Sequence, residues 1–222
     1  MIRSNLAILI LKEFHLELRK KSVLSGLLLY LSSTIFIYYL TFSLRQNLIN
    51  PLVWSALFWV TSLFTAINSV AKSFMGEKKD REIYYYSLLS PASVILSKIL
   101  YNFLLCLALA LTGYMLFILF INNPILDFPV FAATLILTSL GFSSSLTLLS
   151  GIASKTHNGH ILMAVLGFPV IIGILLMAIR ITKNCIDGLE SSASADELLL
   201  LGAINLLTAA VSYLLFPYIW RS

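Results

Sequence analysis

The side chains with the clearest capacity for chemistry are two histidines, His157 and His160, in the stretch KTHNGHIL. A spacing of three places both imidazoles on one face of a helix, where they could bind a metal ion or a haem iron. Two residues alone are too few to be a specific signal of such a site. The alternative is a short solvated connection between two apolar segments, and this is the position that we expect.

The common catalytic and nucleotide-binding patterns are absent from the sequence. It contains neither HExxH nor GxSxG, and it lacks the GxxxxGK[ST] loop that binds the phosphates of ATP. Cys106 and Cys185 are far apart and form no CxxC pair. The chain is therefore expected to be a non-catalytic subunit, and ATP that powers it would be hydrolysed by a partner.

Charge and aromatic character gather in the segment from Gly76 to Lys98, GEKKDREIYYYSLLSPASVILSK. Its first part is charged, its middle is amphipathic, and Pro91 is typical of a helix start, so we expect two short helices outside the bilayer core. Aromatic and apolar side chains rimmed by charge are typical of a protein–protein contact, whereas the alternative is a solvated hairpin. The candidate ATPase-coupling residues are Glu77, Asp80, Arg81, Glu82, Tyr84, Tyr85, Tyr86, Leu88, Leu89, Pro91 and Lys98.

The elements that must position this segment are apolar. Hydrophobic residues make up 59% of the 222 and charged residues 11%, against roughly 25% charged in soluble domains. A bilayer core of about 30 Å takes about 20 helical residues, and six uncharged runs reach that length. We expect an all-α integral membrane protein, one domain over 1–222, with an amphipathic interfacial helix at 2–21 and spans at approximately 23–42, 51–71, 99–121, 128–154, 161–179 and 198–220.

The distribution of Lys and Arg predicts the orientation of these spans. Twelve of the fifteen fall on the side that holds both termini, and only Arg45, Arg180 and Lys183 fall on the other. Positive residues are enriched in cytoplasmic connections, so both termini are expected in the cytoplasm. The segment Arg180 to Glu197 is then an outer connection, which its composition predicts to be flexible. The net charge of +5 reflects this topology and gives no indication of nucleic-acid binding.

Polar side chains inside the six runs are amides and hydroxyls rather than ions. The absence of an intramembrane carboxylate, Lys or Arg from these runs disfavours an ion-coupled transporter. Small and hydroxylated residues commonly join helices in membranes, so helix packing is the first interpretation and the lining of a polar translocation path is the second. Pro169 predicts a bend in the fifth span. The polar residues that would either pack helices together or line a translocation path are Asn68, Asn102, Ser143, Ser144, Ser145 and Asn205.

An acidic residue, a Leu-Leu-x-Pro motif and a Lys sixteen positions after the acid resemble the loop between the second and third spans of ABC-2 type exporter permeases. Here these residues are Glu82, Leu88, Leu89, Pro91 and Lys98. Over nearly its full length the chain is similar to the CcmB family, the permease of the cytochrome c maturation haem exporter. The similarity is carried by LILKEFHLELRKK, SLLSPASVILSKIL and GIASKTHNGHILMAVLGFPVIIGIL.

The resemblance implies a multi-pass component of the bacterial inner membrane that pairs with a second copy of itself and with two copies of a cytoplasmic ABC ATPase. It also implies a separate haem-handling membrane subunit and a periplasmic haem chaperone as partners. ATP would then be bound by the partner, and haem would be a substrate of the complex rather than a cofactor of this chain. The ATP would drive either haem export or release of the loaded chaperone.

Two other functions are compatible with the same sequence features. One is an ABC-2 permease that exports a lipid, a glycan or a drug. The other is a scaffold that assembles haem-handling partners and transports nothing. A scaffold differs from any permease in its need for ATP, because a scaffold would tolerate an inactive ATPase and a permease would not.

Overall fold

The computed structural model describes residues 21–43, 49–70, 90–155 and 159–221, and within these ranges it is helical with no strand. Six helices in these ranges are long and apolar enough to cross a membrane, which confirms the predicted all-α membrane architecture. The elements are α2 (Lys21–Phe42), α3 (Pro51–Val70), α6 (Pro91–Phe120), α7 (Phe128–Ala153), α8 (Gly159–Asp187), the 3-10 helix η2 (Ser191–Ser194) and α9 (Ala195–Arg221).

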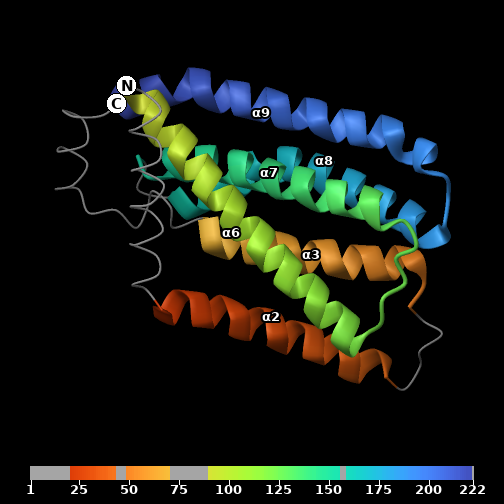
Figure 1. The fold of residues 1–222 in the computed structure, drawn as a ribbon. Coiled ribbons are helices and arrows are strands. Elements are labelled where there is room, and N and C mark those ends of the chain that lie inside the picture. The colour runs from red at the N-terminus through yellow and green to blue at the C-terminus, as the bar shows by residue number, and fades with distance from the viewer. Residues whose placement is uncertain (1–20, 44–48, 71–89, 156–158, 222) are drawn as a thin grey trace.

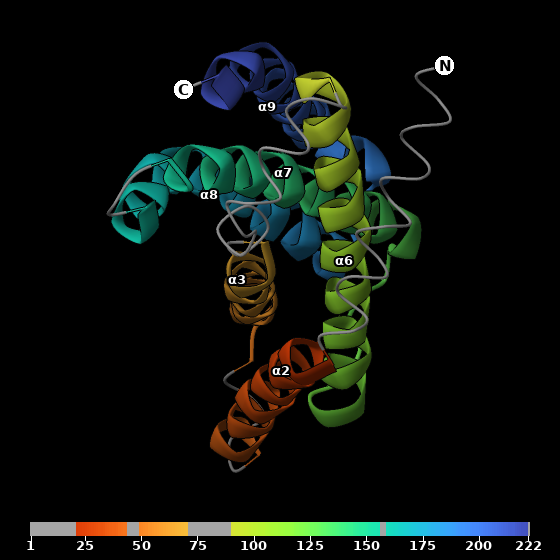
Figure 2. The same cartoon turned by 90° about the vertical axis from the view of Figure 1, so that its left-hand side faces the viewer.

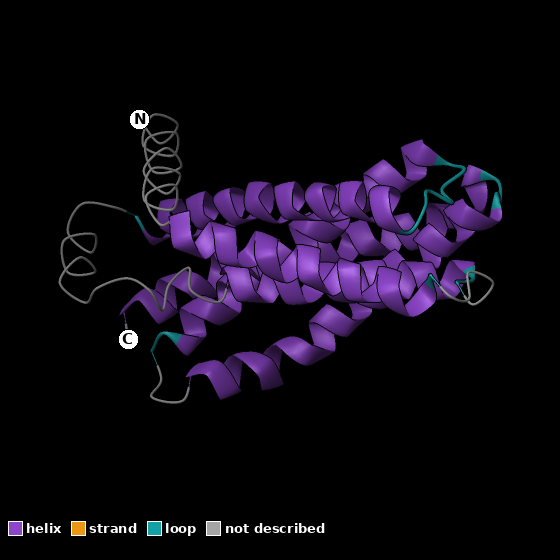
Figure 3. Ribbon diagram, turned by 90° about the horizontal axis from the view of Figure 1, so that it is seen from below, coloured by secondary structure: helices purple, strands orange, loops and turns teal. Residues whose placement is uncertain are grey.

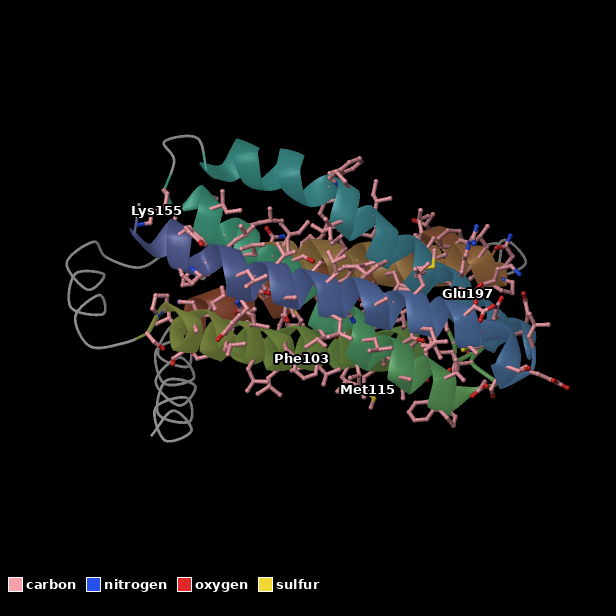
Figure 4. All side chains as sticks on the ribbon, turned by 90° about the horizontal axis from the view of Figure 1, so that it is seen from above. Phe103, Met115, Lys155 and Glu197 are labelled. Atoms are coloured by element: carbon pink, nitrogen blue, oxygen red, sulfur yellow. The ribbon has the colours of Figure 1, made fainter. Side chains whose placement is uncertain are left out.

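The helices alternate in direction, so their connections gather at two ends of the bundle (Figure 1). We call the end where α2, α6 and α8 begin and α3, α7 and α9 finish the near end, and the opposite end the far end. Lys155 lies at the near end and Glu197 at the far end (Figure 4). The start of the first span and the finish of the last span therefore share one end, as the charge distribution predicts.

α7 forms the centre of the bundle. It packs against α3, α6, α8 and α9, and 72% of its most apolar stretch is buried, compared with 17% for α2 and 22% for α9. Figure 2 agrees, because α2 lies apart from the main group of helices, and among the described residues it packs mainly on α3 and α6. The many small residues of α7 allow four neighbours to approach one helix.

An aromatic cluster fills the core towards the far end, where α3, α6 and α7 meet. The ring of Trp54 stacks on Phe58 with 5.5 Å between centroids, and it meets Phe117 edge-on at 5.2 Å. Phe131 of α7 packs against Phe58 at 5.9 Å. The neighbouring Trp59 donates from Nε1 to Thr182 Oγ1 at 2.8 Å, which joins α3 to α8. Aromatic pairs with this geometry add stability beyond the area that they bury.

α6 is longer than the expected third span. It starts at Pro91, as predicted, but it continues unbroken to Phe120, so the expected separate short helix after Pro91 is instead the first part of the span. Its 30 residues correspond to about 45 Å, half as long again as the bilayer core. The helix accordingly crosses the bundle obliquely, from α9 at the near end to α2 at the far end (Figure 1).

α8 is also longer than expected, and the prediction of a flexible outer connection from Arg180 to Glu197 was wrong. Arg180, Lys183 and Cys185 belong to α8, which continues through Pro169 to Asp187 and bends along its length (Figure 4). Gly188, with φ of +68°, ends α8 in the left-handed conformation that glycine adopts readily. Only residues 188–190 then separate α8 from the short helix η2.

Charged residues near the ends of the helices follow from these longer spans. Lys98 lies in α6, and Arg180 and Lys183 lie in the last turns of α8. The uncharged runs thus form only parts of the helices. The exposed Arg180 can extend its guanidinium towards the nearby membrane surface, as long basic side chains do near the ends of spans.

The far end is held together by short connections, which appear as loops between the helices in Figure 3. Asp127 caps the start of α7, where its carboxylate accepts from Val130 N at 3.2 Å, and the same carboxylate accepts from Ser191 Oγ at 2.6 Å. The backbone N–H of Leu126 donates to the carbonyl of Cys185 at 3.1 Å. These bonds tie the α6–α7 connection to the end of α8 and to η2.

The amphipathic helix expected at 2–21 lies outside the described residues except for its last position, Lys21, and so does the segment from 71 to 89. The described chain resumes at Ser90, whose Oγ accepts from Ser93 N at 3.3 Å and caps α6, with Pro91 in the first turn. A serine cap followed by proline is a frequent start for a helix.

We predict that Ser90→Ala loosens the first turn of α6, because it removes the hydroxyl that accepts from Ser93 N and leaves that N–H only the Ser90 carbonyl. The loss is expected to be about 1 kcal/mol. Amide hydrogen exchange of residues 91–95 should become faster, while exchange in the middle of α6 should not change. Ser90→Asn, which preserves the cap, is the control. Equal protection in the Ala and Asn variants would show that the cap does not stabilise this turn.

Candidate coupling site and buried polar contacts

Two of the eleven candidate coupling residues, Pro91 and Lys98, lie within the described structure. The other nine, Glu77, Asp80, Arg81, Glu82, Tyr84, Tyr85, Tyr86, Leu88 and Leu89, lie outside the described residues. Pro91 occupies the first turn of α6 and is half-buried. The predicted docking segment, residues 76–90, therefore leads directly into α6, a helix that spans the bundle.

The start of α6 packs against the end of α9 to form a small apolar cluster, which we call the α6–α9 junction. It consists of Val94, Ile95 and Ile99 from α6 and Phe216 from α9. Ile95 and Phe216 are almost completely buried, with 0% and 1% of their surfaces exposed. Beside it lies a cavity of about 340 Å³ lined by Ala92, Tyr213, Leu214, Pro217 and Tyr218. The junction fixes the position of α6 at the place where the coupling segment ends.

Lys98 belongs to this part of the bundle rather than to its surface. Its side chain is 2% exposed and lies one turn after Val94 and Ile95 on the same helix. An ammonium group is rarely buried so fully unless other groups of the protein contact it. In the described structure Lys98 is therefore placed to anchor the start of α6, and it does not present its charge to a partner.

Three polar contacts join α7 to its neighbours. Asn102 Nδ2 of α6 donates to Thr147 Oγ1 at 2.8 Å, with both side chains buried. Towards α9, Ser144 Oγ and Thr208 Oγ1 lie 3.0 Å apart. In membranes, interhelical hydrogen bonds of this kind contribute on average about 0.6 kcal/mol each. They are too weak to drive association alone, but they fix which faces of the helices meet.

The third polar contact depends on a glycine. Asn205 Nδ2 of α9 donates to the main-chain carbonyl of Leu137 at 2.7 Å, which brings its amide directly against α7. A Cβ atom at Gly141 would lie 2.4 Å from Asn205 Oδ1 and 3.0 Å from Ile174 Cδ1 of α8. Only a residue without a side chain leaves room for both neighbours, so α7, α8 and α9 approach one another closely at Gly141.

The structure divides the six polar residues that the sequence singled out. Asn102, Ser144 and Asn205 join helices, Ser143 donates to the carbonyl of Leu140 within α7, and Ser145 Oγ is buried without a partner. Asn68 is exposed. The interhelical contacts fit the first interpretation, helix packing, for three of the six.

Sequence reasoning did not single out Thr147, Thr208 or Gly141. Thr147 and Gly141 lie inside the stretch SLGFSSSLTLLSG, and Thr208 follows Asn205 by three positions, which places both on one face of a helix. The small and hydroxylated residues that make these contacts could therefore be recognised in the sequence as candidates for helix packing. Which of several small residues in α7 faces α9, however, is decided by the packing of three helices together.

The two histidines of the KTHNGHIL stretch have no described side-chain position. His157 lies outside the described residues, and His160 falls in the first turn of α8, where side chains are not described. Within the described ranges, no group of three or more His, Cys, Asp or Glu residues comes close enough together to hold a metal ion. Both cysteines are buried, Cys106 in α6 and Cys185 in α8.

The six long apolar helices of the described ranges are those of a multi-span all-α membrane protein. A family model described as CcmB protein matches residues 4–220, so the chain belongs to the CcmB family. This family provides a membrane component of the haem-exporting ABC transporter for cytochrome c maturation. A comparison with curated proteins gives no match.

We predict that Gly141→Ala destabilises the bundle, because the new methyl group would clash with Asn205 Oδ1 and press on Ile174 Cδ1. Overpacking of this kind costs about 1–3 kcal/mol. Thermal unfolding in detergent should show a lower midpoint. Adding Asn205→Ala should recover part of the loss, because it removes the clashing atom.

Gly202, on α9 with open space around its Cβ position, provides the matched control. Gly202→Ala should leave the midpoint unchanged or raise it, because alanine favours a helix more than glycine does. Strictly additive effects of Gly141→Ala and Asn205→Ala would contradict a direct contact between the two residues.

Proposed function

We propose that this chain is the permease through which a partner ATPase drives the haem-exporting transporter. The complex would contain two copies of this chain and two copies of a cytoplasmic ABC ATPase. Two observations support the proposal. The sequence has no nucleotide-binding loop of its own, and it carries a charged, tyrosine-rich segment of the kind that binds proteins. The ATPase would dock on this segment, residues 76–90.

The observation that carries the proposal is the continuity of α6. The helix begins at Pro91, directly after the docking segment, and reaches the far end without interruption. Near its start it packs on Phe216 of α9, and farther along it lies against Leu31 of α2, whose Cδ1 is 3.7 Å from the Cβ position of Gly113. A displacement at the start of such a rigid element would be carried through its packed neighbours.

The proposal places the near end in the cytoplasm, with both termini on that side. The basic residues of the described ranges support this orientation, because four lie towards the near end and two towards the far end. The four are Lys21, Lys98, Lys155 and Arg221, and the two are Arg180 and Lys183. Positive residues are retained on the cytoplasmic side during membrane insertion. In a bacterial inner membrane the far end would then face the periplasm.

We assign haem handling to partners, as the family resemblance implies. A separate membrane protein would hold haem, and a periplasmic chaperone would receive it at the far end. In this assignment the present chain converts ATP hydrolysis into movement, and haem is the substrate of the whole complex. Purifying the chain together with its membrane partners and recording which component carries the haem absorbance tests the assignment.

Replacing the tyrosines of the docking segment should release the ATPase. We predict that Tyr84→Ala, Tyr85→Ala and Tyr86→Ala combined, with or without Glu82→Gln, reduce the amount of ATPase that co-purifies with the chain by more than tenfold, because aromatic anchors dominate binding at such contacts. Tyr39→Ala, an exposed tyrosine near the far end of α2, is the control and should retain the ATPase.

Undiminished co-purification of all these variants would overturn the docking role. A second measurement separates the permease from a scaffold. With a partner ATPase that binds but does not hydrolyse ATP, a permease should yield no c-type cytochromes, whereas a scaffold would still support their formation. Export of a lipid, glycan or drug instead of haem would leave c-type cytochromes intact when the gene is deleted.

A variant of the α6–α9 junction should separate docking from transmission. We predict that Phe216→Ala leaves ATPase binding in place but lowers c-type cytochrome formation severalfold, because the start of α6 loses its contact on α9. Phe216→Leu should keep much of the function. The adjacent Leu215, 46% exposed, provides the control Leu215→Ala. Normal cytochrome content in Phe216→Ala, with normal protein levels, would show that the junction transmits nothing.

A further inference from the structure

A cavity of about 310 Å³ opens at the far end among α3, the α6–α7 connection and the end of α8. It is lined by uncharged residues. Of these, Asn50 and Asn122 are exposed, while Trp54 is buried. The lining residues are Ile49, Asn50, Pro51, Trp54, Ile121, Asn122, Pro124 and Ile186.

The indole of Trp54 carries an unsatisfied hydrogen-bond donor. Its Nε1 has no partner in the described structure, although the side chain is only 2% exposed. A buried donor without a partner costs about 1–3 kcal/mol, so buried tryptophans usually have an acceptor. The nearby Trp59 shows the usual case, because its Nε1 donates to Thr182.

The surroundings of the ring show where an acceptor can come from. Phe58, Phe117 and Phe131 pack against Trp54, and these side chains offer no oxygen. Asn50 Oδ1 is already engaged, because it accepts from Val53 N at 2.8 Å in the first turn of α3. Trp54 also lines the cavity, although its Nε1 atom is covered by neighbouring atoms. An acceptor for this N–H would therefore enter from the cavity with a small shift of the lining side chains.

The backbone at one lining residue of the cavity is also unusual. Asn122 has a φ of +123°, a conformation that residues other than glycine rarely adopt. Such positions persist only where surrounding contacts enforce them, and they cluster at ligand sites. The lining of the cavity thus includes an unpaired buried donor, Trp54, and a strained residue, Asn122.

We propose that this cavity binds a glycerolipid of the bilayer leaflet at the far end, with an ester carbonyl accepting from Trp54 Nε1. The cavity lies at the ends of membrane-spanning helices, where the ester groups of lipids are found and where tryptophan is enriched. Exposed Leu52 and Leu126, at the same end, provide apolar surface for an acyl chain. The lining has no cation, so a neutral carbonyl fits it better than a phosphate does.

The experiment compares diester and diether phosphatidylethanolamine of equal chain length. The two lipids differ only in the carbonyl oxygens, so the comparison tests the acceptor directly. The purified full chain is stripped of lipid in detergent and titrated with each, and native mass spectrometry counts the bound molecules. One hydrogen bond predicts that the diester binds about two- to tenfold more tightly.

Trp54→Phe should abolish this preference, because it removes the N–H and retains an aromatic ring. Trp59→Phe makes the same chemical change in the same cluster, at a residue whose N–H is already paired within the protein, and it should retain the preference. Ile186→Phe leaves the indole in place and fills the cavity. It should lower the binding of both lipids and provides the test if Trp54→Phe fails to fold.

Equal affinity of the unaltered chain for the two lipids would overturn the proposal, as would a preference that survives Trp54→Phe. Saturable binding of a peptide from a periplasmic partner that competes with the diester lipid at this site would also overturn it. The result does not depend on the ATPase, because the proposal requires only that the chain spans a membrane.

Discussion

Close approach of helices around α7 is the constraint on which this bundle depends. Lipid tails are as apolar as leucine side chains, so burying apolar surface provides little drive for helices to associate inside a bilayer. Association must come from tight packing and from a few polar contacts. Gly141, with Asn205 and Ile174 against it, makes both possible at one point, because α9 donates a hydrogen bond to the backbone of α7 where α8 also comes close.

The arrangement of the other helices follows from this centre. α3 and α8 are joined by Trp59 and Thr182, and the aromatic cluster fills the wider space towards the far end, where α6 diverges from its neighbours. α2 stays at the edge with most of its surface towards lipid. The core therefore combines small residues at the close helix contacts with large aromatic residues such as Phe58 and Trp59 towards the far end.

Much of the fold could be predicted from the sequence, because the dominant signal is physical and local. Uncharged runs of about 20 residues specify spans, and Pro91 specifies a helix start. The ends of the spans were harder to predict. Arg180 and Lys183 suggested a loop, yet α8 continues past both, since a basic side chain near the end of a helix can reach the membrane surface. Charge marks where a helix nears the surface rather than where it ends.

The candidate sites also include features that the sequence predicts and features that only the folded structure shows. The docking segment stands out in the sequence because its charge and tyrosines are anomalous beside apolar runs. The α6–α9 junction could not be predicted, because Val94, Ile95 and Phe216 are unremarkable apolar residues until folding brings positions more than a hundred residues apart into contact. The burial of Lys98 is likewise a property of the folded bundle, since its sequence context suggests a surface position.

The oblique course of α6 connects the protein to the thickness of its membrane. A helix of this length meets a bilayer by tilting, so a thinner membrane favours a larger angle and a thicker one favours a more upright position. Because α6 is held by Phe216 near its start and lies against Leu31 farther along, any change of angle alters both contacts together. Lipid composition would therefore tune the geometry of the bundle mechanically, without any molecule binding to it.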